Sequence, residues 1–194
     1  MIQLNPNWRK VLSREEVAQW ADSRPKASFY DLWEDTIDPT WPCLAKAGGA
    51  TQQQLVFAVC AVARLCLPLL PEGDDVPVIV VRYHPRIIIE TAEAWCRGEA
   101  TEKQVLESRG SARRKVSGGD YLFVTAYAFA AASSAINNDK DSIYFYYAYT
   151  VYFAMRAGVE SQVACKTLRK HLPFERPPRP KGLTVWQRIA TGNE

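Results

Sequence analysis

Two long apolar segments dominate the hydrophobic pattern of the chain, and a short polar turn from Asn137 to Lys140 separates them. In both segments apolar residues recur at steps of three and four on every side of a helix, so no polar face is left. A helix that is apolar all round must be buried on most sides. The pattern therefore predicts a buried helical hairpin at 120–136 and 142–157, with the rest of the chain packed around it.

Two other interpretations of the hairpin are less well supported by the pattern. The second segment is rich in Tyr, Phe, Val and Ile, which favour strands, but it continues for about fifteen residues where strands usually end after about five or six. Neither segment reaches the roughly twenty apolar residues that span a membrane. The N-terminal residues MIQLNPNWRK also lack the apolar core of a signal peptide. We expect a cytoplasmic protein with no membrane span.

Capping signals place further helices along the chain. Ser13 to Glu16 and Thr101 to Gln104 have the form of a capping box, Thr51 is a good N-cap, and Pro85 suits a first helical residue. Pro68 should loosen the end of the helix that starts after Thr51. The positions predicted to face inward on these helices are Leu55, Val59, Val62, Cys66 and Leu69, then Ile88, Thr91, Ala92, Trp95 and Cys96, then Val105 and Leu106, and finally Val163, Ala164, Thr167 and Leu168.

One run, Val76 to Tyr83, looks like a strand, and a single strand cannot form a sheet. It is expected to be extended, either pairing with a second copy in a homodimer or turning into the next helix. The sequence thus predicts an all-α fold: one helical domain over 1–172, a bundle of about six to eight helices around the hairpin. Residues 1–48 form an N-terminal extension packed on that domain, and 173–194 a Pro-rich basic tail.

Composition and charge narrow the functional classes. Five cysteines are an odd number, widely spaced and without a Cys-x-x-Cys pair, so we interpret them as reduced core residues. The formal charge of +3 is too small to imply nucleic-acid binding, but it is unevenly distributed. Residues 1–100 hold 10 Lys and Arg against 13 Asp and Glu, and 101–194 hold 14 against 8. The two halves, at 10 − 13 = −3 and 14 − 8 = +6, therefore offer different partner surfaces.

Groups suited to catalysis are sparse. The only histidines, His84 and His171, stand beside basic residues and not beside a carboxylate that could orient an imidazole. No phosphate-binding Gly loop and no cluster with metal-ligand spacing occurs. We predict no catalytic residues, no metal and no cofactor.

Glu90 and Glu93 stand three residues apart on one predicted helix, a spacing that could serve acid–base or metal chemistry. Arg86 precedes Glu90 by four residues, and Arg97 follows Glu93 by four. Ion pairs at that spacing are typical of a solvated helix face. We therefore interpret the two glutamates as surface residues.

Aromatic and acidic residues alternate between 28 and 42. Burying every ring there would draw carboxylates inward at a cost of several kcal/mol each, so we expect Tyr30 or Trp33 to be partly exposed and ringed by acids. That composition is typical of an interface anchor, although a short amphipathic helix with a solvated acidic face is the alternative. The predicted partner-binding residues are Tyr30, Asp31, Trp33, Glu34, Asp35, Asp38 and Trp41. The aromatics of the hairpin are also too numerous for its neighbours to cover, so some of them should reach solvent.

Basic residues gather at two places, and both could contact phosphates. The alternative partner surface is the first cluster, Arg109, Arg113, Arg114 and Lys115. The second cluster is Lys166, Arg169, Lys170, Arg176, Arg179 and Lys181. No motif that reads bases accompanies either cluster.

Residues 85–107 resemble the small helical immunity-protein family of bacterial polymorphic toxin loci, and the resemblance extends over about 51–172. It is carried by Pro85-Arg86, Ala92, Trp95, Gly98-Glu99 and the Leu65 to Leu70 run with Pro68. The resemblance implies a protein that binds and neutralises a cognate toxin without catalysis. A nucleic-acid-binding accessory protein, and a small-ligand-binding protein or enzyme, remain as alternatives.

Overall fold

The computed structural model describes residues 4–11, 15–35, 41–69, 85–112, 128 and 149–174, and every regular element in this part of the chain is a helix. The α-helices are α1 (Glu15–Asp22), α2 (Phe29–Asp35), α3 (Trp41–Ala47), α4 (Gln52–Arg64), α6 (Pro85–Cys96), α7 (Glu102–Ala112) and α10 (Ser161–His171). Two 3-10 helices, η1 (Trp8–Val11) and η2 (Leu67–Leu69), accompany them, and residues 149–156 are also helical. The predicted all-α class is confirmed.

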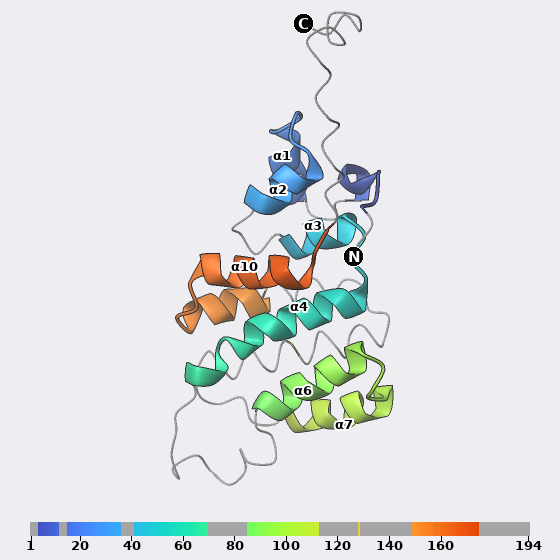
Figure 1. The fold of residues 1–194 in the computed structure, drawn as a ribbon, viewed down its shortest axis with the longest axis vertical. Helices are drawn as coiled ribbons and strands as arrows, with labels where there is room; N and C mark the ends of the chain where they lie inside the picture. Colours follow the sequence, from blue (N-terminus) through green and yellow to red (C-terminus); the bar gives the residue numbers. More distant parts are fainter. Residues whose placement is uncertain are drawn as a thin grey trace, which may run out of the picture.

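Helix α4 is the centre of the packing. It lies between α10 on one side and α6 on the other, and its N-terminal part also meets α3 (Figure 1). Leu55, Val59 and Val62 of the predicted stripe are at most 1% exposed. A helix contacted from several sides needs apolar residues around most of its circumference, and α4 supplies them with Ala, Val and Leu.

The helical hairpin predicted at 120–136 and 142–157 lies mostly outside the described residues. Ala128 is fully buried in its first half, and the helix at 149–156 belongs to its second half. Val151 and Ala154 from that helix join the same core cluster as α4. The described end of the hairpin is thus buried on one side only, as the exposure of Tyr152 below shows.

The start of α4 follows its sequence signals, and its end loosens near Pro68 as predicted, but Leu69 is not buried. The Thr51 hydroxyl accepts the Gln54 N–H at 3.2 Å, and the Gln54 side-chain oxygen accepts the Thr51 N–H at 2.8 Å, which is the capping box in both directions. The α-helix stops at Arg64, and Pro68 falls within η2. Leu69 is 47% exposed, so its predicted core position is wrong. The change to a 3-10 helix breaks the register that kept the stripe inward.

Helices α6 and α7 begin where the sequence predicts. Pro85 opens α6, and Gly98, with φ at 76°, ends it in the left-handed conformation that glycine favours. Thr101 and Gln104 then cap each other as predicted, with N–O distances of 2.8 and 3.3 Å. On α7 itself, Val105 is fully buried, whereas Leu106 is 40% exposed.

The inward face of α10 is turned slightly from the predicted one. Ala164 and Leu168 are buried as expected, but Val163 is 44% exposed and Cys165 takes its place inside. The predicted core position of Val163 is therefore wrong, and the side of α10 that packs in the core contains Cys165.

The cysteines whose side chains the structure describes are free thiols, with Cys60, Cys66 and Cys165 buried and Cys96 half-buried, which agrees with the predicted reduced core residues. One described stretch, Gln52–Leu69, is long and apolar enough to cross a membrane by length and composition alone, and half of it is buried inside the protein. A core helix meets the same criteria. Ser13, the Val76 to Tyr83 segment and the chain beyond Phe174 lie outside the described residues.

Candidate functional site

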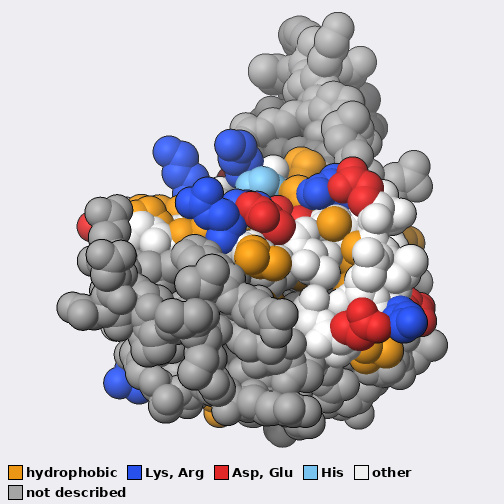
Figure 2. All heavy atoms as spheres, turned by 90° about the horizontal axis from the view of Figure 1, so that it is seen from below, with side chains coloured by type: hydrophobic (Ala, Val, Ile, Leu, Met, Phe, Trp, Pro, Cys, Tyr) orange, Lys and Arg blue, Asp and Glu red, His pale blue; other side chains and the backbone are white. Residues whose placement is uncertain are grey.

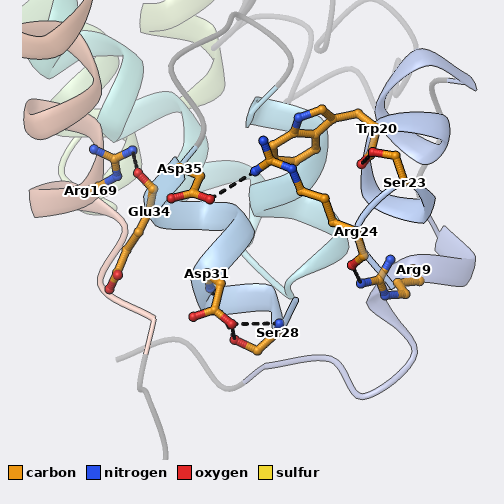
Figure 3. Close-up of polar contacts among 9 residues, drawn as sticks. All are labelled: Arg9, Trp20, Ser23, Arg24, Ser28, Asp31, Glu34, Asp35 and Arg169. Atoms are coloured by element: carbon orange, nitrogen blue, oxygen red, sulfur yellow. Dashed lines mark hydrogen bonds and ion pairs between the residues drawn. The ribbon is translucent and has the colours of Figure 1, made fainter. Parts of the chain in front are cut away.

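The predicted partner-binding segment forms α2, and its first acid has a local structural role. The Asp31 carboxylate accepts hydrogen bonds from the Ser28 N–H at 2.9 Å and from the Ser28 hydroxyl at 2.6 Å (Figure 3). The Ser28 oxygen in turn receives the Asp31 N–H at 3.2 Å. This is a capping arrangement at the start of α2. Asp31 is thereby committed to holding the helix start.

The expectation of an exposed Tyr30 or Trp33 is wrong. Tyr30 is 8% exposed and Trp33 is 7% exposed. Phe174, which follows α10, lies against both Trp33 and Phe29, with ring centroids 5.1 and 4.8 Å away. The rings are buried without their acids, because the side chains of Glu34 and Asp35 remain exposed to solvent. The alternative of an amphipathic helix therefore describes α2 correctly.

A cation from α10 closes the other end of α2. The Arg169 guanidinium donates to the main-chain carbonyl of Trp33 at 3.2 Å and to that of Glu34 (Figure 3). Carbonyls at a helix C-terminus lack intrahelical partners and carry partial negative charge, so a guanidinium stabilises them. Arg169, predicted to belong to a phosphate-binding cluster, is thus directed into the protein.

Two more arginines hold α1 against α2. Arg9 donates to the carbonyls of Ala21, Arg24 and Ala27 at 2.7, 3.1 and 2.9 Å, which fixes the chain between these helices. Arg24 pairs with Asp35 at 3.0 Å (Figure 3), and its guanidinium lies 5.0 Å from the centroid of the Trp20 ring. The acids of α2 are therefore partly used to bind the N-terminal helices.

Within its described residues, the predicted partner surface has an acidic rim and no exposed aromatic centre. Glu34 and Asp35 are exposed, and Asp31 is half-buried. Asp38 and the side chain of Trp41 lie outside the described residues, as do the side chain of Arg109 and all of Arg113, Arg114 and Lys115.

A second polar cluster joins α4 to α6. Nε and Nη2 of Arg64 each donate to one oxygen of Glu93 at 2.6 Å, and Glu90 lies 4.0 Å from the same guanidinium. Glu93 is only 7% exposed, so its interpretation as a solvated residue is wrong. Arg97, its expected partner, pairs with Glu99 at 2.8 Å instead. Hydrogen bonding to Glu93 raises the pKa of Arg64, as a tight ion pair does.

The thiols beside this ion pair are poor nucleophiles. Burial raises the pKa of Cys60 well above its usual range, and raises that of Cys96 to about 12. The thiolate is the nucleophilic form of cysteine, and burial disfavours that form at both positions. Among the residues that the structure describes, no group of three or more His, Cys, Asp or Glu could hold a metal ion.

His171 lies at the junction of α10 with α4. Its ring meets the ring of Phe57 edge-on, with centroids 5.5 Å apart. Burial, followed by the charge of Lys170, lowers the pKa of His171. Figure 2 shows cationic and acidic side chains gathered around a histidine on the face seen from below.

An exposed aromatic residue was predicted in the hairpin, and in the structure Tyr152 is 47% exposed. Its ring contacts those of Phe153 and Tyr149, with centroids 5.4 and 6.4 Å away. Met155 and Val163, on the same helix and the next, are 37% and 44% exposed. The prediction that the hairpin cannot bury all its rings is confirmed, and Tyr152 lies far along the chain from Tyr30 and Trp33.

Comparisons with known protein families, with curated protein sequences and with solved structures find no match to this chain.

Proposed function

We propose that this protein acts by binding another protein, and that its partner is a cognate toxin which it neutralises in the cytoplasm without catalysis. The observation that supports binding is the exposure of Tyr152 within a packed group of rings. The toxin as partner follows from the immunity-family resemblance of residues 51–172.

Tyr152 has the physical properties of an interface anchor. Tyrosine offers a large, rigid, amphipathic surface whose ordering costs little conformational entropy, and it is enriched among residues that dominate binding energy. The Tyr152 ring contacts the rings of Tyr149 and Phe153, and these contacts limit the conformations that it can adopt. Met155 adds adaptable apolar surface on the same helix.

The chemistry of the buried polar residues supports binding over catalysis. Glu93 is held by two hydrogen bonds to Arg64, which join α4 to α6. His171 faces the ring of Phe57. These groups stabilise contacts between helices.

The test is neutralisation of the product of a neighbouring toxin-like reading frame. That product should stop bacterial growth when expressed alone, and coexpression of this protein should restore growth. Tyr152→Ala should reduce the restoration, and Leu106→Ala, at a similarly exposed apolar position on α7, should leave it intact. Failure of this protein to restore growth, or to copurify with that product, would overturn the proposal.

A further inference from the structure

The helix at 149–156 divides sharply into an inner and an outer side. Val151 and Ala154 are buried in the common core. Tyr152 and Arg156, four residues apart, are exposed on the opposite side. An aromatic ring and a guanidinium therefore share one solvent-facing stripe.

Helix α10 is divided in the same way. Ala164 and Leu168 are buried, while Val163, Lys166 and Lys170 are exposed at spacings of three and four. An apolar side chain is again followed by cations along the outer stripe.

The connection between the two helices brings these stripes together. The helix at 149–156 ends in a turn closed by the Val159 N–H on the carbonyl of Ala154 at 3.0 Å, with Gly158 at a φ of 101°. Only a few residues separate the helices, so they lie side by side and antiparallel (Figure 1). Both helices bury their inner sides in one core, and this short turn joins them. We name the combined surface, formed by Tyr152, Arg156, Val163, Lys166 and Lys170, the Tyr152 face.

The Tyr152 face is cationic. Residues 149–174 contain four cationic side chains, those of Arg156, Lys166, Arg169 and Lys170, against the single acid Glu160, a net charge of 4 − 1 = +3. Arg169 is directed to the carbonyls of α2, whereas Lys166 and Lys170 are exposed on the outer side of α10. Cations around exposed apolar side chains complement a partner whose surface mixes carboxylates with apolar groups.

From this arrangement we infer that the Tyr152 face binds a carboxylate-rich, partly apolar segment of a protein, with carboxylates beside Lys166 and Lys170 and apolar side chains against Tyr152 and Val163. The inference rests on the proposed protein-binding function and gives the chemistry of the partner. A phosphate polymer fits less well, since only three cations are spread among apolar side chains that would meet no apolar group.

The probe for this inference is a short amphipathic helical peptide of Glu and Leu carrying a fluorophore, with its binding followed by fluorescence anisotropy. The full-length protein should bind it, and binding should weaken between about 50 mM and about 200 mM salt as the charges are screened. Joint Lys166→Glu and Lys170→Glu substitution should lower the affinity at least about tenfold. Tyr152→Ala should lower it several-fold. Lys103→Glu, an exposed cation on α7, is the matched control and should leave the affinity unchanged.

The inference is overturned if the peptide does not bind, if the double variant binds it as well as the parent, or if single-stranded oligothymidylate binds more tightly than the peptide. The experiment uses no toxin. If the protein neutralises the toxin but does not bind the peptide, only the inference about the Tyr152 face is rejected. If it binds the peptide but does not neutralise the toxin, only the toxin as partner is rejected.

Discussion

Arg64 and Glu93 form a doubly hydrogen-bonded ion pair, although 29 residues separate them. The pair ties the end of α4 to the middle of α6, the two helices with the most extensive mutual contact in the described part of the chain. Arg64 is 38% exposed along its side chain and Glu93 only 10%, so solvent reaches the cation and hardly reaches the carboxylate.

Replacing Glu93 should therefore cost stability. Glu93→Gln removes the charge from a nearly buried group and should lower the free energy of unfolding by roughly 1–3 kcal/mol, since hydrogen bonds to charged groups contribute about that much. Urea denaturation measures the change. Glu90→Gln, at 4.0 Å from the same guanidinium and exposed, should cost less than about 0.5 kcal/mol. Equal losses of stability in the two variants would contradict the expected difference between the nearly buried Glu93 and the exposed Glu90.

Gly48 should not tolerate a larger residue. A Cβ at this position would lie 2.4 Å from a ring carbon of Phe29 and 2.8 Å from one of Phe174. The Phe29 ring is 1% exposed and cannot move aside, so Gly48→Ala should destabilise the protein by about 1–3 kcal/mol through overpacking. Gly98→Asn is the control, because a side chain there meets nothing within 4 Å and Asn tolerates a positive φ. In thermal unfolding, the midpoint temperature of Gly48→Ala should therefore lie below that of Gly98→Asn.

Arg169→Met should uncap α2 while it keeps the apolar stem of the side chain. The carbonyls of Trp33 and Glu34 would lose their donor, and we expect a loss of about 1–2 kcal/mol in unfolding free energy. Proteolysis within residues 15–35 should accelerate in parallel. Lys166→Met on the exposed side of α10 should change neither quantity, and an Arg169→Met protein as stable as the parent would show that the cap contributes nothing.

Stability should depend on pH through His171. Its folded-state pKa lies below the ordinary value of 6.5, because burial and Lys170 disfavour the charged ring. Below that value the unfolded chain binds a proton more readily than the folded one, so stability is fully present above about pH 6.5 and falls as the pH is lowered toward the folded-state pKa. His171→Phe keeps a ring against Phe57 and should flatten this slope. Chemical denaturation at several pH values provides the comparison, and an unchanged slope would assign the pH dependence to other groups.

Local signals in the sequence were sufficient to predict the starts of α4, α6 and α7. Thr51 with Gln54, and Thr101 with Gln104, cap helices through bonds within three residues, so no distant part of the chain is needed to interpret them. Pro85 fixes a start through its own ring. The all-α class followed from these starts and from the apolar periodicity.

Distant contacts decided what the sequence could not predict. Trp33 is buried because Phe174 packs on it from 141 positions further along the chain, and Glu93 is buried because its partner is Arg64 and not the neighbouring Arg97. Both outcomes depend on which helices meet. The sequence could predict that some aromatic residue of the hairpin is exposed, because the hairpin has more rings than its neighbours can cover. It could not predict that this residue is Tyr152.

The packing of α10 on α4 also has a consequence for biosynthesis. Helix α4 ends at Arg64 and α10 begins at Ser161, so the ribosome adds 160 − 64 = 96 residues between them. At synthesis rates of about 5–20 residues per second, the side of α4 that α10 will cover has no native neighbour for roughly 5–20 s. An apolar surface exposed for that long on a nascent chain is a binding site for chaperones, and slowing translation after Arg64 should increase the aggregated fraction of newly made protein.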